Sequence, residues 1–331
     1  MAHRVTLIPG DGIGPEITEA TLQVLAATGV ELDWERVDVG EVSLAAGGPL
    51  LPEQVFESIR RTGVALKGPV GTPIASGHRS VNVTIRQTLD LYACLRPVRN
   101  VPGVETPFKD VNLVIVRENT EGMYSGLEHM VTKGVAESLK VVTEKGSTRI
   151  AQFAFDYAQR RGINKVTAVH KANIMKLTDG LFLDCTRRVR EGYPSVDYNE
   201  LIVDNCAMQL VRWPQQFGVL VMNNLYGDIL SDLAAGLVGG LGVSPGANIG
   251  ADAAVFEPIH GTAPDIAGKG WANPTAMLLS SALLLEHVGE PEAAGRLRAG
   301  LERVLSEGTR TRDLGGQAGT TEFAQAVAAA L

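Results

Sequence analysis

Two aspartates four residues apart are the first candidates for chemistry in this sequence. The segment GDILSDLAAGLVGGLG places Asp228 and Asp232 at the start of an expected helix, and this spacing puts both carboxylates on one face. An isolated pair of this kind is more often explained by the helix dipole, which favours acidic residues near the N-terminus. Here the helix that follows is almost wholly apolar, so we expect buried carboxylates that need a cation. Oxygen-only ligands suit Mg²⁺ or Mn²⁺ better than zinc.

Four more charged residues stand beside apolar stretches. Asp204 ends the stretch LIVD, which predicts a strand, and strand ends are common positions for site residues in α/β sheets. Arg86, Arg96 and Arg117 lie in TIRQTLDLYA, CLRPV and VIVRENTEG. Internal salt bridges with neighbouring acidic residues would account for any one of these arginines. Three together indicate a pocket for a polycarboxylate, because the guanidinium group binds carboxylates through two parallel hydrogen bonds.

Two glycine-rich turns are candidates for nucleotide binding. The N-terminal PGDGIGPE lacks the GxGxxG spacing of a dinucleotide fingerprint, and a tight strand-to-helix turn explains its glycines. The segment HGTAPDIAGKGWANP, residues 260–274, would let a ligand approach the backbone closely. Asp265 in it is placed to accept hydrogen bonds from a ribose 2′-hydroxyl and to repel a 2′-phosphate, which favours NAD over NADP. A surface turn with a helix cap is the ordinary alternative for this segment.

Strands that alternate with helices are expected to position these residues. The apolar pattern predicts strands over residues 5–8, 64–67, 111–116, 165–169, 201–204 and 219–222, and helices over 15–27, 148–161, 179–191, 229–241 and 273–287. This alternation favours an α/β fold, and 331 residues favour two domains. Residues 131–143 alternate like a hairpin, for which a protruding arm and an ordinary surface hairpin are equally good explanations.

Composition narrows the class of protein and its partners. The chain is 45% hydrophobic and 20% charged with a net charge of −7, so we expect no broad surface for nucleic acid. The most apolar stretch, residues 276–285, is too short to span a bilayer, and the N-terminus does not resemble a signal peptide. Cys94, Cys185 and Cys206 form no CxxC pair, which predicts a reduced, cytoplasmic protein.

These motifs together resemble those of the β-decarboxylating dehydrogenases, which comprise isocitrate, homoisocitrate and 3-isopropylmalate dehydrogenases. The likeness runs from LIPGDGIGPE through LDLYACLRP, VHKANIMKLTDGLF and HGTAPDIAGKGWANP to DLGGQAGT and covers nearly the whole chain. It implies the two-domain α/β fold of isocitrate/isopropylmalate dehydrogenases, which is not a Rossmann fold. The expected division is a large NAD-binding domain, 1–98 plus 235–331, and a small domain, 99–234, with the dimer interface and a protruding arm. The expected assembly is a homodimer with shared active sites, or a tetramer.

The resemblance also implies roles for individual residues. Asp204, Asp228 and Asp232 would bind Mg²⁺ or Mn²⁺, with Asp204 supplied by the partner subunit. Tyr124 and Lys171 would be the acid–base pair, with Lys171 also supplied across the interface. The carboxylate clamp would be Arg86, Arg96 and Arg117, and the NAD site would be formed by Ile13, Thr72, His260, Gly261, Thr262, Ala263, Pro264, Asp265, Ile266 and Asn273. NADP-dependent members tend to carry Lys and Tyr where this chain has Asp265 and Ile266, so NAD is expected.

Substrate choice depends on the segment SVNVTIR. Isopropylmalate enzymes resemble one another in placing apolar residues there, whereas Ser80 and Asn82 are polar and suit the extra carboxylate of isocitrate. Homoisocitrate differs by one methylene, which a pocket discriminates only modestly, so homoisocitrate dehydrogenase or dual activity is the alternative. 3-Isopropylmalate is less favoured. A regulatory subunit without activity is also disfavoured, because all the implied catalytic residues are present.

Overall fold

The computed structural model describes residues 2–71 and 80–331, and one large mixed sheet runs through them. Ten strands pair in the order β2-β1-β3-β12-β11-β4-β5-β10-β8-β9. Their bounds are β1 His3–Ile8, β2 Leu32–Arg36, β3 Val64–Lys67, β4 Ala93–Arg99, β5 Asn112–Glu118, β8 Lys165–His170, β9 Asp197–Ile202, β10 Val219–Met222, β11 Pro245–Ile249 and β12 Ala254–Pro258. The pairs β12–β11, β11–β4 and β4–β5 are antiparallel, and the others are parallel.

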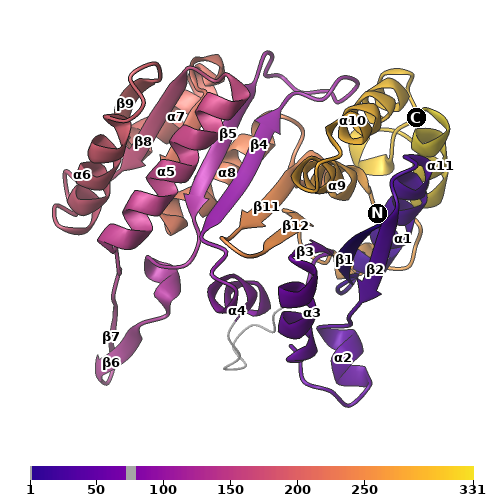
Figure 1. Ribbon diagram of the computed structural model, residues 1–331, viewed down its shortest axis with the longest axis horizontal. Helices are drawn as coiled ribbons and strands as arrows, with labels where there is room; N and C mark the ends of the chain where they lie inside the picture. The colour runs from indigo at the N-terminus through magenta and orange to yellow at the C-terminus, as the bar shows by residue number, and fades with distance from the viewer. Residues whose placement is uncertain (1, 72–79) are drawn as a thin grey trace.

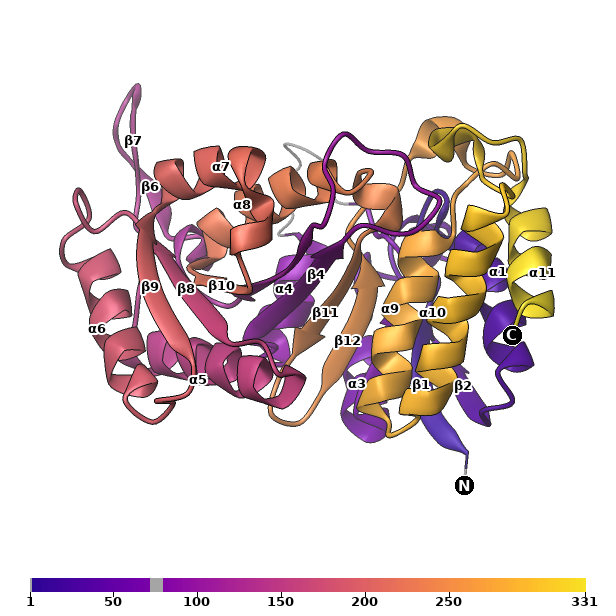
Figure 2. The same cartoon turned by 90° about the horizontal axis from the view of Figure 1, so that it is seen from above.

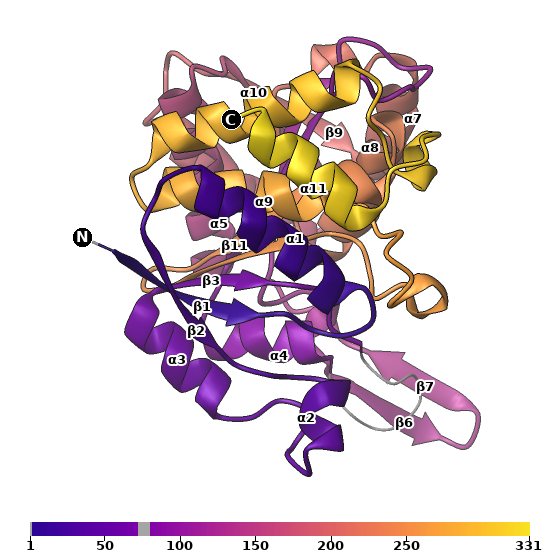
Figure 3. The ribbon, with the colours of Figure 1, turned by 90° about the vertical axis from the view of Figure 1, so that its right-hand side faces the viewer.

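Helices cover both faces of this sheet (Figure 1). They are α1 Gly14–Ala27, α2 Glu41–Ala45, α3 Gln54–Thr62, α4 Val81–Thr88, α5 Glu144–Arg161, α6 Thr178–Arg190, α7 Val203–Arg212, α8 Asn224–Leu237, α9 Thr275–His287, α10 Pro291–Ser306 and α11 Thr320–Ala329. Short parallel strands such as β3 and β10 are buried along their whole length, which explains their unbroken apolar sequences. The helix α9 is buried almost throughout, between the sheet and the outer helices α1, α10 and α11 (Figure 3).

The two ends of the chain build one half of the sheet, and the middle of the chain builds the other. Strands β1, β2, β3, β11 and β12 lie on one side of β4, while β5, β10, β8 and β9 lie on the other. The predicted domain boundaries fall at the end of β4 and inside α8, and both elements continue across them. The division into 1–98 plus 235–331 and 99–234 therefore stays a prediction.

A two-stranded arm projects from the body of the molecule (Figures 1 and 2). It consists of β6 Glu128–Thr132 and β7 Val135–Ser138, which pair antiparallel and are exposed along their whole length. The hairpin thus protrudes, although it lies slightly earlier than the expected residues 131–143. Its apolar residues include Met130 and Val131, which are 61% and 51% exposed. An exposed apolar arm of this kind is typical of a surface that meets another protein.

Two of the predicted elements were misplaced. The strand expected over 201–204 is β9, which ends at Ile202, so Asp204 lies in the first turn of α7 and does not end a strand. Strand β9 pairs with β8 from Asp197 onward, and this pairing sets its end. The helix expected from residue 229 begins at Asn224, so Asp228 lies one turn inside α8. Within the described residues, no helix is both long and apolar enough to cross a membrane.

Candidate active site

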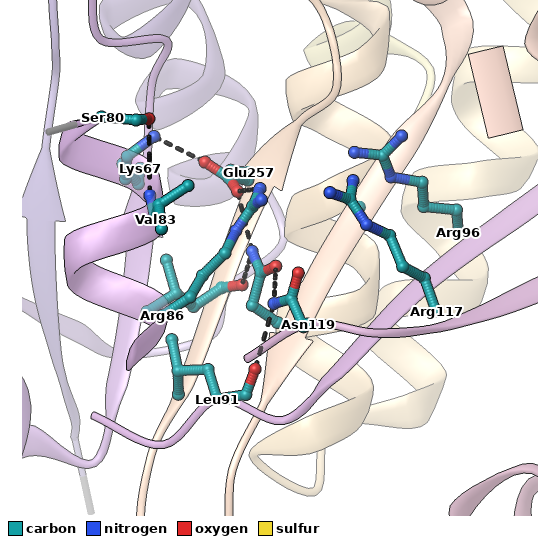
Figure 4. A network of polar contacts seen from close by, with 12 residues as sticks. Lys67, Ser80, Val83, Arg86, Leu91, Arg96, Arg117, Asn119 and Glu257 are labelled. Carbon is teal, nitrogen blue, oxygen red and sulfur yellow. Dashed lines mark hydrogen bonds and ion pairs between the residues drawn. The ribbon is translucent and has the colours of Figure 1, made fainter. Parts of the chain in front are cut away.

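The expected arginine cluster forms where β4, β5 and α4 approach one another. Arg96 lies on β4, Arg117 near the end of β5 and Arg86 in the last turn of α4. Their side chains are 7%, 1% and 12% exposed. The guanidinium groups of Arg96 and Arg117 lie beside each other and face the space next to Arg86 (Figure 4). Burial lowers the pKa of Arg117, and the positive charges of Arg96 and Arg86 lower it further. Such a cluster of buried cations favours an anionic ligand.

Asp228 is the acidic centre of this cluster. Its carboxylate pairs with Arg117, lies 3.6 Å from Arg96 and accepts a hydrogen bond from the Tyr124 hydroxyl. Burial would raise the pKa of Asp228, but Arg117, Tyr124 and Arg96 together bring it below its ordinary value. Gly227 makes this approach possible, because a Cβ there would collide with the side chain of Arg117. The glycine before Asp228 is therefore required by packing of α8 against β5.

Tyr124 lies in the short 3₁₀ turn Met123–Ser125, opposite α8. Its ring centroid lies 5.0 Å from the guanidinium carbon of Arg117, a cation–π contact. Burial raises the pKa of Tyr124, and its hydrogen bond to the anionic Asp228 raises it further. The hydroxyl therefore keeps its proton at neutral pH.

One chain brings together only part of the predicted metal ligands. Asp232 lies one turn after Asp228 on α8, 3.3 Å from Arg96, and burial together with Asp228 raises its pKa. Asp204 instead pairs with Lys171 at 2.9 Å, and neither of these two residues pairs with the arginine cluster in the described part of the chain. Within those residues no group of three Asp, Glu, His or Cys side chains is placed to hold a metal ion. Of the three predicted metal ligands, the described part of one chain brings together Asp228 and Asp232 and leaves Asp204 apart from them.

A cavity of about 120 Å³ borders the cluster. Arg86, Arg96, Asn82 and His260 line it, so it joins the predicted substrate and cofactor residues. In the described part of the chain, three buried atoms of its lining have no hydrogen-bond partner: Asn82 Oδ1, Arg86 Nε and His260 Nε2. Leaving a buried polar atom without a partner costs free energy, so these atoms are available to a polar ligand or to water. Ser80 does not line this cavity; its hydroxyl caps α4 by accepting a hydrogen bond from the Val83 amide.

Two lining residues were missed from the sequence. Lys67, at the end of β3, forms a 2.5 Å ion pair with Glu257 on β12, and Glu257 also accepts a 3.0 Å bond from Arg86 (Figure 4). Burial would raise the pKa of Glu257, but Lys67 and Arg86 hold it far below its ordinary value. A charged residue inside a short apolar strand, VALK or AVFEP, was the available signal.

The predicted cofactor loop joins the first helix of the chain. The Ile13 amide donates to the Thr262 carbonyl at 2.9 Å, and Gly12, at φ +59°, has no room for a Cβ beside that carbonyl. Ala263 takes the left-handed φ of +38° before the short turn Pro264–Ile266, on which Asp265 is exposed. Glu16 of α1 accepts from the amides of Gly270 and Ala272, at 3.2 and 2.9 Å. Thr72 lies outside the described residues.

Asn273 closes the far end of this loop. Its side-chain amide donates to Asp313 at 2.9 Å, and its oxygen accepts from the Thr275 amide at the start of α9. The loop is thus held by α1 at one end and by α9 at the other, while its central turn stays exposed. The backbone groups of the exposed turn are thus accessible to a ligand, while the two ends of the loop stay packed against α1 and α9.

Comparison with known proteins agrees with this geometry. A model of the isocitrate/isopropylmalate dehydrogenase family matches residues 4–327. This chain belongs to the isocitrate/isopropylmalate dehydrogenase family. It is 53% identical over 324 residues to the mitochondrial catalytic subunit 5 of NAD isocitrate dehydrogenase from Arabidopsis thaliana, covering 97% of this chain and 87% of that one. It is 52% identical over 306 residues to a chloroplastic 3-isopropylmalate dehydrogenase of Solanum tuberosum, covering 92% and 86%.

A solved structure gives the same result for the fold. The crystal structure of isocitrate dehydrogenase from Methylococcus capsulatus superposes with a TM-score of 0.96 at 52% identity and covers 99% of each chain. The predicted family, fold class and enzyme class are therefore confirmed. The roles of single residues stay predictions, supported by the geometry described above.

Proposed function

We propose that this member of the isocitrate/isopropylmalate dehydrogenase family oxidises and decarboxylates isocitrate to 2-oxoglutarate, with NAD and Mg²⁺ or Mn²⁺ as cofactors. The observation that carries the proposal is the cluster of Arg86, Arg96 and Arg117 around Asp228 and Tyr124, beside a cavity whose lining has polar atoms without a hydrogen-bond partner among the described residues. Relatives named as NAD isocitrate dehydrogenases, at 49–53% identity, support the same activity.

The substrate fits the charge of the cluster. Isocitrate carries three carboxylates, and the three arginines supply three guanidinium groups that are already held in place by packing and hydrogen bonds. Arg117, for instance, donates to Asn224 Oδ1 at 2.9 and 2.7 Å. Preorganised cations of this kind bind an anion without a further ordering cost. Asn82, whose Oδ1 is unpartnered in the described part of the chain, favours a polar group over the apolar branch of isopropylmalate.

The donor set fits a hard divalent cation. Asp228 and Asp232 offer carboxylate oxygens only, and Asp204 of a second copy would supply the third. When bound, Mg²⁺ or Mn²⁺ would lower the pKa of the substrate hydroxyl and stabilise the charge left after loss of CO₂. Asp228 pairs with Arg117 and accepts a hydrogen bond from Tyr124, so carboxylate oxygens for a cation lie beside guanidinium groups for an anionic substrate.

Proton transfer falls to Lys171 and Tyr124. Lys171 of a second copy, as its neutral amine, would accept the proton of the substrate hydroxyl, and NAD when bound would supply the acceptor for the hydride on the carbon that bears this hydroxyl. Tyr124, with its raised pKa, holds a proton and would deliver it to the carbon that has lost CO₂. The arginines would keep the two remaining carboxylates fixed, so that only the third is free to leave.

The NAD site is proposed along residues 260–274 and the first turn of α1. Backbone at Ile13 and Thr262 would form its floor, and His260, whose Nε2 has no hydrogen-bond partner among the described residues, lines the cavity beside Arg86 and Arg96. The exposed Asp265 is placed to accept from a 2′-hydroxyl and to repel a 2′-phosphate. Thr72 remains a proposal from the resemblance alone.

The assembly that we propose is a homodimer with shared sites. Exposed apolar side chains lie beside residues of the proposed shared site: Ile174 and Leu177, after Lys171, are 70% and 89% exposed, and Ile229, next to Asp228, is 58% exposed. Further exposed apolar residues lie on α7 and the arm, namely Met208, Val211, Leu127, Met130, Val131, Val135 and Leu139. Exposed apolar side chains in this number favour burial against a second copy. Light scattering that gives the mass of one chain would contradict it, and a mass of four would favour the tetramer.

The reduced, cytoplasmic setting also stays a proposal. Cys94, Cys185 and Cys206 are free and buried, which is consistent with a reducing environment.

The decisive experiment is initial-rate NADH formation with Mg²⁺ and three substrates in parallel. Isocitrate should give the highest kcat/KM, followed by homoisocitrate, whose extra methylene a pocket rejects only modestly. Highest activity with homoisocitrate would leave the family and the proposed mechanism unchanged, but the substrate would then be homoisocitrate and not isocitrate. Highest activity with 3-isopropylmalate, the substrate named for the Solanum relative, would overturn the assigned role of Asn82. Binding of NAD without turnover of any substrate would favour a regulatory subunit.

A further inference from the structure

A buried carboxylate outside the described site connects Lys171 to two other parts of the molecule. Asp179, in the first turn of α6, is completely buried. Its Oδ2 accepts a 2.6 Å hydrogen bond from the backbone amide of Lys171 and a 3.0 Å bond from the Tyr226 hydroxyl. Its Oδ1 pairs with the Lys140 ammonium group and accepts a 3.3 Å bond from the Asn223 amide.

The donors come from separate segments that gather at one end of the molecule (Figure 2). Lys140 follows the last strand of the arm, Lys171 follows β8, and Asn223 and Tyr226 begin α8. Lys140 is itself nearly buried, 12% exposed, and lies 4.6 Å from the centre of the Tyr226 ring. One carboxylate thus fixes the base of the arm, the loop of Lys171 and the start of the helix that carries Asp228.

A carboxylate is the side chain that this position requires. Four donors converge on its two oxygens, and each oxygen serves two of them. An amide of the same size would offer one acceptor oxygen and bring two additional donors, so it would satisfy only one side of the network. A charged acceptor also makes stronger hydrogen bonds than a neutral one, which sharpens the position of the Lys171 backbone.

We propose that Asp179 is a positioning residue for Lys171 that acts on the active site of the partner subunit. The inference rests on the proposed function, in which Lys171 and Asp204 are delivered to a second copy while Asp228 and Tyr124 serve the chain's own site. Lys171 already pairs at 2.9 Å with Asp204 in the first turn of α7, so the two side chains are presented together, and Asp179 holds the backbone amide of Lys171. Small displacements of a catalytic group, of about 1 Å, can cost about 100-fold in rate.

The first test is Asp179→Asn in the purified dimer. The kcat for isocitrate should fall about 100-fold, while KM should stay within about threefold, because the arginines that bind the substrate are untouched. A purely structural role would lower the melting temperature and leave kcat per active site unchanged. The double variant Asp179→Asn with Lys140→Met removes the buried unpaired ammonium group, so it keeps the chain folded if the single variant is unstable. It should retain the low kcat; a wild-type kcat in it would overturn the proposal.

The second test asks in which subunit Asp179 acts. A differently tagged heterodimer is formed from one Tyr124→Phe chain and one Asp179→Asn chain. One of its two sites then receives Tyr124 from the second chain and a correctly held Lys171 from the first, so about half of the wild-type activity should return. If Asp179 instead acted through α8 on its own Asp228, that site would also be damaged and activity would not return, which would overturn the proposal.

Failure of the proposed function is distinguishable in the same experiment. Wild-type protein that does not turn over isocitrate, or that is monomeric by light scattering, contradicts the function or the shared site. Wild-type activity in a stable dimer, with no effect of Asp179→Asn on kcat, contradicts only the role of Asp179.

Discussion

Replacing Glu257 by glutamine should destabilise the protein strongly, because Glu257 neutralises two buried cations. Its carboxylate lies 2.5 Å from the ammonium group of Lys67 and 3.0 Å from the guanidinium group of Arg86, and it accepts a 2.8 Å bond from Asn248. The Lys67 side chain is only 2% exposed, and among the described residues it also donates to the carbonyl of Gly68 at 3.0 Å. Breaking a buried pair from one side costs about 3–5 kcal/mol.

That loss converts into a measurable change in melting temperature. For a chain of this size about 2 °C is lost per kcal/mol, so Tm of Glu257→Gln should fall by roughly 6–10 °C at neutral pH in differential scanning calorimetry. The matched control is Glu302→Gln, which removes a half-exposed pair with Arg99 and should change Tm by less than about 2 °C. Adding Lys67→Met to Glu257→Gln should recover part of the loss, because the unpaired ammonium group is then absent.

The pH dependence gives an independent check. The folded protein holds the pKa of Glu257 below its unfolded value of about 4.3, so this carboxylate contributes its full stabilisation above that pH. The contribution is lost as the pH falls from the unfolded towards the folded pKa. The difference in Tm between wild type and Glu257→Gln should therefore narrow in acid. A change in Tm below 2 °C at neutral pH, or a difference that widens in acid, would refute the reasoning.

Three further predictions concern the site itself. Tyr124→Phe should lower kcat for isocitrate about 100-fold or more with little change in KM, because it removes the proton donor and leaves the arginines in place; unchanged kcat would exclude the role. Asp228→Asn should weaken Mn²⁺ binding at least about tenfold in a direct titration followed by electron paramagnetic resonance, and equal affinity would remove Asp228 from the ligands. Asp265→Lys combined with Ile266→Tyr should raise the ratio of NADP to NAD kcat/KM about 10- to 100-fold, since a charge-assisted contact replaces a repulsion; an unchanged ratio would place specificity elsewhere.

Much of the fold could be predicted because the local pattern of apolar and polar residues indicates where strands and helices lie. The strands β3 and β10 are short apolar runs buried on both faces, and α1, α6 and α9 begin and end close to the expected residues. The placement of Asp204 was wrong because a strand end depends on pairing with a neighbour, here β8, which no local pattern reports.

The sequence by itself determined which chemically active residue types are available to the site. Asp228 and Asp232 share a helix face through their spacing alone, and the arginines are marked by the apolar runs beside them. The sequence did not determine which charged side chains form ion pairs with each other. Lys67 and Glu257 are 190 residues apart and meet only because β3 and β12 are neighbours in the sheet.

Only the tertiary structure decided which charged side chains neutralise each other and which residues lie apart from the arginine cluster. Asp228 and Tyr124 meet across 104 residues, whereas Lys171 and Asp204 pair with each other and not with that cluster in the described chain. Burial makes an unpaired charge costly, so each buried charge is fixed by the partner that the fold brings to it. A linear pattern specifies residue type and face, while such long-range partners follow from the order of strands in the sheet.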